Sequence, residues 1–267
     1  MLDTAISIYK YRSLLATLTS RELKARYRGS VLGYLWSLAN PLLLLSVYTF
    51  VFSYVFDPRD PNVTPYGLFL VTGLFPWIWF QTALTEGAAA VHANAGLIRK
   101  ATFPCELLPM VSVLANLIHF AFALPMIAMA FGLFRLLGFS AGGWAVVLLP
   151  LVVVLQFPLV AGLTLGLAAL NTHFKDVKDI LNNVLTLMFF MTPILYTMKA
   201  VAPFRPIYLV VSANPLTPFI QAYQDVLFFN RVPSASHWLI LLVVSLLGWA
   251  AGAWLFERLS ETMVEAI

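Results

Sequence analysis

Three cations near the amino-terminal end are spaced for one face of a helix. Arg21, Lys24 and Arg28 are three and four residues apart, so in a helix their side chains project from the same side. Guanidinium and ammonium groups form charge-assisted hydrogen bonds with phosphate oxygens. The spacing predicts a site for the phosphates of a lipid-linked substrate. An electrostatic anchor to the membrane surface is the alternative that these residues leave open.

The segment that must position these cations is amphipathic. Residues 6–28 place the cations in one helical stripe and apolar side chains in another, the apolar ones being Tyr11, Leu14, Leu15 and Leu18. A helix of this kind lies in the plane of the membrane interface. We therefore expect an interfacial helix within residues 1–30.

The rest of the chain has the composition of a membrane protein. Its 267 residues are 61% hydrophobic and only 10% charged, and the mean hydropathy is +0.86. A soluble domain of this length needs more surface charge. Because lipid cannot satisfy an open backbone, about 20 apolar residues cross a bilayer as a helix. We expect an all-α polytopic protein with six transmembrane helices, at residues 32–56, 66–90, 107–134, 144–170, 180–196 and 238–256.

The basic residues predict the orientation of these spans. With the amino terminus in the cytoplasm, that side receives about eleven Lys and Arg residues and the opposite side about five. Both termini are therefore expected to be cytoplasmic. The net charge of +4 reflects this asymmetry, so nucleic acid is not an expected partner. The polar, amphipathic first residues do not have the pattern of a cleavable signal sequence.

Residues for catalysis or cofactor binding are sparse. Cys105 is the single cysteine, the four histidines are scattered, and the sequence contains no Gly-Lys-Ser/Thr phosphate loop. We therefore expect no metal or cofactor in this chain, and any ATP that drives it to bind another chain. A membrane-embedded glycan or lipid transferase needs acid, base or histidine groups at one depth, whereas the ionisable residues are dispersed. A small-molecule or ion channel is the other open class.

Two segments between spans indicate interactions beyond the bilayer. Residues 92–104 follow the second span, with Asn94 as a helix cap and Pro104 as a terminator. A short helix there would present apolar and basic side chains to a soluble partner, or else form a loop at the lipid headgroups: Leu97, Ile98, Arg99, Lys100 and Phe103.

Residues 198–237 are interrupted by prolines between the fifth and sixth spans. Broken helices survive at membrane depth only where protein or water shields the backbone. We expect a re-entrant helix pair that forms an outer gate, with a surface-lying loop as the alternative. The candidate gate residues are Asn214, Pro215, Pro218 and Tyr223.

Several motifs together resemble the ABC-2 type permeases, in particular the branch that exports polysaccharides such as O-antigen and teichoic acid. The resemblance is carried in order along most of the chain by residues 21–28, 30–36, 40–42, 73–77, 98–104 with Glu106 and Pro109, and 214–216. The combination is far more specific than any one motif. We expect no fused ATPase and no large extracytoplasmic domain in this chain, unlike other ABC-2 branches.

This resemblance implies a homodimeric permease joined to two copies of a separate ABC ATPase, which holds ATP and Mg. It would move an undecaprenyl-diphosphate-linked polysaccharide from the cytoplasmic to the outer face of the bacterial inner membrane. The single transmembrane domain would comprise a gate helix (1–30), the first two spans (31–91), a coupling helix (92–104), spans three to five (105–197), the outer gate (198–237), and the last span with its tail (238–267). A small molecule or lipid is the alternative cargo.

A polysaccharide path should combine aromatic surfaces with hydroxyl and amide groups. Aromatic residues recur on one face of the first span and on the fifth, and we take them as path candidates, with lipid contact as the alternative: Tyr34, Tyr48, Phe52, Phe189 and Tyr196. Glu86 and Glu106 lie near helix ends, where water and a salt bridge to Arg99 or Lys100 are expected to stabilise their charges.

Overall fold

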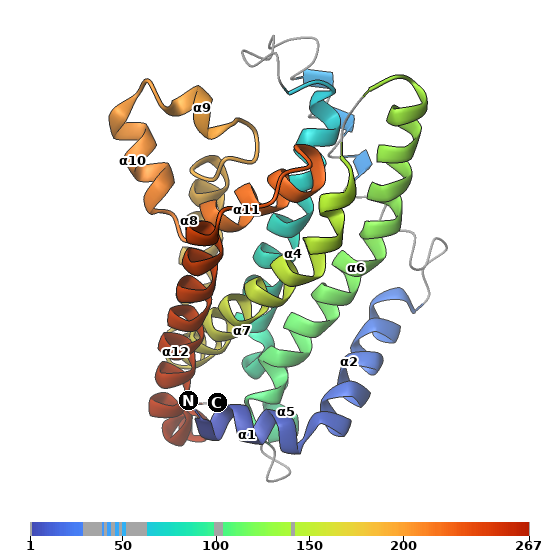
Figure 1. Ribbon diagram of the computed structural model, residues 1–267. Helices are drawn as coiled ribbons and strands as arrows, with labels where there is room; N and C mark the ends of the chain where they lie inside the picture. Colours follow the sequence, from blue (N-terminus) through green and yellow to red (C-terminus); the bar gives the residue numbers. More distant parts are fainter. Residues whose placement is uncertain are drawn as a thin grey trace.

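The computed structural model describes residues 2–28, 39, 42–43, 46–47, 50–51, 63–98, 104–139 and 142–266. Within these ranges every regular element is a helix (Figure 1). Both termini lie at one end of the bundle, which we call the near end; the opposite end is the far end (Figure 1). The all-α class is therefore confirmed for this part of the chain.

Four of the predicted spans are confirmed as long apolar helices. In the described part of the chain, the candidate spans are Tyr66–Ala93, Leu107–Leu136, Trp144–His173 and Ala235–Ser260. They correspond to α4 (Tyr66–Ala93), α6 (Leu107–Leu136), η3 with α7 (Trp144–Leu148 and Leu149–His173) and α12 (Ala235–Ala266). At about 1.5 Å per residue each exceeds the roughly 30 Å of a hydrocarbon core. The predicted first span, 32–56, lies largely outside the described residues.

The predicted fifth span has different bounds. Its helix, α8, is Val177–Phe190, so the expectation that helix continues to residue 196 is wrong. Pro193 lacks a backbone N–H for a continued helix. Its carbonyl instead accepts a 2.6 Å hydrogen bond from Gln224 Nε2, and Thr192 Oγ1 accepts one of 2.8 Å from Asn214 Nδ2. These side chains hold the chain in a turn where the periodicity predicted helix.

α4 forms the centre of the bundle. Its large side chains Phe69, Trp77, Trp79 and Phe80 are fully buried, and it packs against α6, α7 and α8. Trp79 stacks on Phe120 of α6, with ring centroids 5.7 Å apart. The first half of α6 is largely buried, whereas exposed side chains gather in its second half, between Ala121 and Leu136. Because this half of α6 is strongly apolar, its exposed surface suits contact with lipid or with another membrane helix.

α7 and α12 approach each other so closely that only glycine fits between them. A Cβ on Gly252 would lie 1.7 Å from the carbonyl oxygen of Gly162, and one on Gly162 would lie 2.4 Å from that of Gly248. Small residues four positions apart allow this backbone contact between membrane helices. The glycine spacing is present in the sequence, but spacing alone does not identify which helix lies opposite.

The single helix expected over residues 6–28 is two helices. α1 (Leu2–Lys10) lies across the near end, and α2 (Arg12–Tyr27) turns at Tyr11 and rises beside α6 (Figure 1). α1 is held by Thr4 Oγ1, which donates a 2.7 Å hydrogen bond to Glu257, and by Ser7, which donates to Glu106. The predicted apolar stripe of α2 is confirmed, because Leu15 is buried and Leu14 and Leu18 pack on the core.

Short helices fill the far end between α8 and α12. They are α9 (Met198–Val201), α10 (Arg205–Ala213), α11 (Thr217–Tyr223) and the π-helical turn η4 (Gln224–Phe228). α10 is largely exposed, whereas α11 is buried against α4, α7 and α12. The predicted break between them is present: Asn214 Oδ1 accepts the Leu216 amide at 3.0 Å in a local turn.

Candidate functional site

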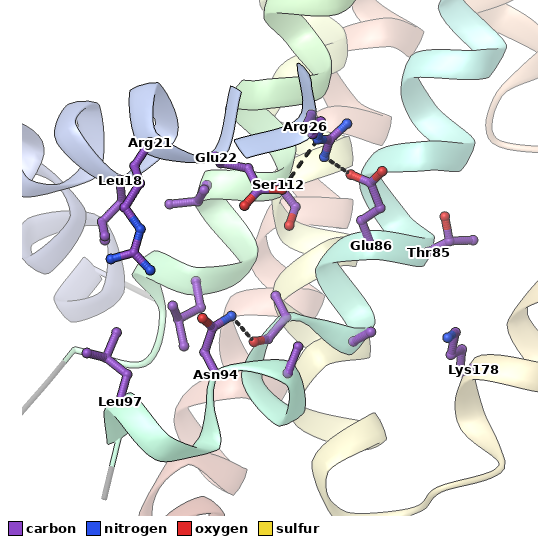
Figure 2. Close-up of a pocket in the computed structure, with 15 residues that line it drawn as sticks. Leu18, Arg21, Glu22, Arg26, Thr85, Glu86, Asn94, Leu97, Ser112 and Lys178 are labelled. Carbon is purple, nitrogen blue, oxygen red and sulfur yellow. Dashed lines mark hydrogen bonds and ion pairs between the residues drawn. The ribbon is translucent and has the colours of Figure 1, made fainter. Parts of the chain in front are cut away.

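A charged cleft of about 650 Å³ opens at the near end between α2, α4, α6 and the short helix α5 (Ala95–Ile98) (Figure 2). Its polar lining comes from α2, α4, α6 and α8, with Asn94 directly after α4, and includes both signs of charge. The polar residues are Arg21, Glu22, Arg26, Thr85, Glu86, Asn94, Ser112 and Lys178. The cleft therefore joins the cationic helix α2 to the segment in which the sequence predicted a docking site.

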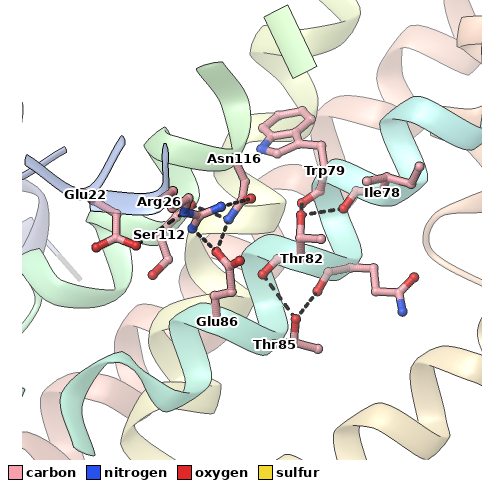
Figure 3. Close-up of polar contacts among 10 residues, drawn as sticks. Glu22, Arg26, Ile78, Trp79, Thr82, Thr85, Glu86, Ser112 and Asn116 are labelled. Atoms are coloured by element: carbon pink, nitrogen blue, oxygen red, sulfur yellow. Dashed lines mark hydrogen bonds and ion pairs between the residues drawn. The ribbon is translucent and has the colours of Figure 1, made fainter. Parts of the chain in front are cut away.

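The Arg26 side chain ties α2 to the two helices behind it (Figure 3). Its guanidinium pairs with the Glu86 carboxylate of α4 and donates a 3.2 Å hydrogen bond to Asn116 Oδ1 of α6. A third and more exposed contact joins Arg26 Nε to Glu22 Oε1 at 3.3 Å within α2 itself. Asn116 is buried and completes the triangle by donating to Glu86 at 2.5 Å and to the Ser112 carbonyl at 2.9 Å. We call Arg26, Glu86 and Asn116 the α2 clamp.

The α2 clamp adds a described partner for one of the two glutamates. The expected salt bridges from Glu86 and Glu106 to Arg99 or Lys100 lie outside the described residues; among the described residues, Arg26 pairs with Glu86. Glu106 accepts from Ser7. Sequence reasoning missed Arg26 because it considered only the cations of one stripe. The available signal was Glu86, an acid in an apolar span, which requires a partner.

The three predicted phosphate-binding cations are all exposed, Arg21 and Lys24 on α2 and Arg28 directly after its last residue. Arg21 lines the cleft, and all three line a second hollow of about 780 Å³ with other α2 residues. No described residue forms an ion pair with Arg21, Lys24 or Arg28. The structure therefore brings them together as a surface of uncompensated positive charge, which favours anions such as phosphate.

The predicted docking segment is partly described. Asn94 ends α4 rather than capping α5 through its side chain: Nδ2 donates to the Ala90 carbonyl at 2.8 Å, while its backbone carbonyl accepts the Leu97 amide at 2.9 Å. Leu97 is 36% exposed, but Ile98 is only 6% exposed. The expectation that Ile98 is presented at the surface is therefore wrong, because it packs into the core. Arg99, Lys100 and Phe103 lie outside the described residues.

The predicted gate residues differ in their surroundings. Asn214 is buried and bonded as described above, and Pro215 is exposed. The Pro218 carbonyl lies 2.8 Å from His237 Nε2. Tyr223 is completely buried and meets Phe120 edge-to-face at 6.1 Å. These contacts join the α10–α11 break to α8, α6 and α12.

Two path candidates lie at the far end of α8, Phe189 within the helix and Tyr196 in the turn that follows it. Phe189 packs against Trp77 of α4 at 5.7 Å, and the Tyr196 hydroxyl donates a 2.8 Å hydrogen bond to the Phe190 carbonyl. Tyr34, Tyr48 and Phe52 lie outside the described residues. α8 also exposes amide and hydroxyl groups that sequence reasoning did not single out, on Asn182, Asn183 and Thr186.

Long apolar helices around a buried α4, with a charged cleft at one end, define a multi-pass membrane protein. The chain belongs to the ABC-2 type transporter family, whose model matches residues 13–228. It is therefore a transporter subunit and not an enzyme. It is 39% identical to the O-antigen export system permease protein RfbA of Myxococcus xanthus over 271 residues, covering 100% of both chains.

More distant relatives also align over most of the chain. The O-antigen export system permease protein RfbA of Klebsiella pneumoniae is 32% identical over 254 residues, which is 95% of each chain. The polysialic acid transport protein KpsM of Escherichia coli is 22% identical over 249 residues, covering 91% of this chain and 92% of KpsM. These identities confirm the family resemblance drawn from the motifs.

Proposed function

We propose that this chain is the permease of an ATP-driven exporter that carries an undecaprenyl-diphosphate-linked polysaccharide of O-antigen type across the bacterial inner membrane. The observation that carries the proposal is the uncompensated cationic surface of Arg21, Lys24 and Arg28 beside the near-end cleft. Such a surface suits the diphosphate of the carrier lipid. Full-length similarity to proteins named for O-antigen export supports the same cargo.

The near end is the cytoplasmic face in this proposal, as the predicted excess of Lys and Arg on that side requires. Residues 32–56 and α8 complete six spans. Two copies of the permease assemble with two copies of a separate ATPase, which binds ATP and Mg. Leu97, the exposed apolar side chain of α5, contacts the ATPase together with Asn94, Arg99, Lys100 and Phe103.

The glycan passes α8 toward the far end. Exposed amides and a hydroxyl at Asn182, Asn183 and Thr186 offer exchangeable hydrogen bonds, and the aromatic residues Phe189 and Tyr196 offer stacking surfaces. Uncovered polar groups at membrane depth favour a hydrated path over lipid contact. The α10–α11 pair, broken at Asn214 and Pro215, acts as the outer gate.

Removing two of the cations tests the carrier-lipid site. In Lys24→Gln/Arg28→Gln, we expect retention of undecaprenyl-diphosphate-linked glycan by the purified permease to fall about thirtyfold, at about 1 kcal/mol per cation near a charged lipid. The matched control is Lys10→Gln/Arg12→Gln, which removes one Lys and one Arg from the same terminal segment. An equal loss in both pairs would support a general membrane anchor and contradict a carrier-lipid site.

A charge at α5 tests the ATPase contact. We expect Leu97→Asp to lose co-purification of the ATPase and polysaccharide export together, because a carboxylate at an apolar contact must be desolvated without a partner. Leu97→Met, which keeps an apolar side chain at the position, should retain both. ATPase binding and export at the wild-type level in Leu97→Asp would remove α5 from the interface.

A further inference from the structure

A separate cavity of about 500 Å³ lies at the far end, between the end of α6 and the start of η3 and α7. Along α6 its lining runs from Leu124 to Arg135, about 16 Å at 1.5 Å per residue. This is about half the thickness of a hydrocarbon core. The cavity therefore extends from the middle of the bilayer to the interface at the far end.

The deep walls of this cavity are apolar and its rim is polar. Ile127, Phe131 and Leu149 line the interior, while Arg135, Trp144 and Asn230 lie at the interfacial end. Among the described residues that line the cavity, Arg135 is the single charged one, and no described residue forms an ion pair with its guanidinium. The cavity thus has the polarity of an amphiphile, with an apolar body and a cationic rim.

Hydrogen bonds hold the rim in place. The Gly142 amide donates to the Phe228 carbonyl at 3.0 Å, and the Ala145 amide donates to Asn230 Oδ1 at 3.0 Å. A Cβ on Gly143 would lie 2.4 Å from the Asn230 side chain, so these segments are in direct contact. These contacts fix the positions of residues 142–145 and 228–230, so the rim of the cavity is well defined.

The side chains around the cavity indicate which kind of ligand it binds. The exposed side chains beside it on α6 are Met129, Leu133 and Leu136, which give the entrance an apolar surface suited to lipid. A water-soluble ligand would have to cross this apolar surface, whereas an acyl chain enters from it directly. The volume is within the roughly 300–1,000 Å³ of ligand sites. Arg135 complements a phosphate at headgroup depth, where long cationic side chains reach the interface.

We propose that this cavity is a binding site for an anionic phospholipid of the leaflet at the far end. One acyl chain fills the space between α6 and α7, and the headgroup phosphate binds Arg135, with the Asn230 amide and Trp144 indole beside it. The site is distinct from the near-end cleft and from the glycan path, and it does not depend on the identity of the exported cargo.

Two substitutions test binding of the acyl chain and binding of the headgroup separately. A Cβ on Gly132 would meet no atom within 4 Å, so Gly132→Leu fills the cavity without a backbone clash; Met129→Phe adds bulk on the lipid-facing side as its control. Arg135→Gln removes the cation, and Arg205→Gln removes an exposed arginine elsewhere at the far end. All four variants are first checked for monodisperse elution in gel filtration.

The measurement is native mass spectrometry of the purified full chain after exchange with phosphatidylglycerol, phosphatidylcholine or undecaprenyl phosphate in separate samples. We expect wild type to retain phosphatidylglycerol in preference to phosphatidylcholine. Gly132→Leu should lose both phospholipids. Arg135→Gln should lower phosphatidylglycerol retention about fivefold, the effect of one interfacial cation, and should leave phosphatidylcholine retention unchanged.

Three results would overturn the proposal. Equal phospholipid retention in Gly132→Leu and Met129→Phe would show that the cavity holds no acyl chain. Equal loss in Arg135→Gln and Arg205→Gln would assign the preference to general surface charge. Retention of undecaprenyl phosphate alone, abolished by Gly132→Leu, would make this a carrier-lipid site and not a phospholipid site.

Discussion

The Gly252→Ala variant is expected to lose at least about 3 kcal/mol of stability, at or beyond the upper range for overpacked interiors. The new methyl carbon would lie 1.7 Å from the Gly162 carbonyl oxygen, and backbone on both sides prevents a side-chain adjustment. α7 and α12 must then separate along their contact. The loss should appear as a lower midpoint of thermal aggregation and as little permease accumulating in the membrane.

Gly132→Ala is the matched control for this prediction, because it makes the same change in a helix where a Cβ meets nothing within 4 Å. In open helical surroundings alanine is favoured over glycine by about 1 kcal/mol, so this variant should be as stable as wild type or slightly more stable. Equal midpoints for the two variants would show that the α7–α12 contact is looser than the structure indicates.

The Arg26→Gln variant is expected to abolish polysaccharide export while the chain still reaches the membrane. Without the guanidinium, the α2 clamp leaves Glu86 as an unpaired carboxylate beside buried Asn116. Breaking a fully buried pair costs about 3–5 kcal/mol. Because Glu86 is 39% exposed and Arg26 23% exposed, solvent reduces this to about 2 kcal/mol. That is enough to free α2 from α4 and α6.

Two further variants distinguish the effect of the α2 clamp from that of surface charge. Glu22→Gln removes only the exposed contact of Arg26 and should change stability by no more than about 0.5 kcal/mol. Glu86→Gln combined with Arg26→Gln removes both charges, so the double variant should be more stable than the sum of the single losses predicts. Export at the wild-type level in Arg26→Gln, measured as glycan at the cell surface, would contradict a role for the clamp in transport.

Much of this architecture follows from local patterns. Apolar runs long enough to cross a bilayer predicted α4, α6, α7 and α12, because a segment in lipid must satisfy its backbone internally whatever it contacts. The proline-containing break at Asn214 was also predictable, since it depends on neighbouring residues alone. The motif order identified the family for the same reason: it is a property of the chain and not of its packing.

Contacts between distant residues were decided only by the packed bundle. Arg26 pairs with Glu86 because α2 rises beside α6 and places that guanidinium against α4. Ile98 turns inward, and α8 ends before Thr192, because core surfaces and side-chain partners from other helices are available there. Periodicity gives the direction of a side chain about its own helix. The packing partner of each helix decides the rest. It determines which charge gains an ion-pair partner, which glycine contacts another backbone and where a cavity remains.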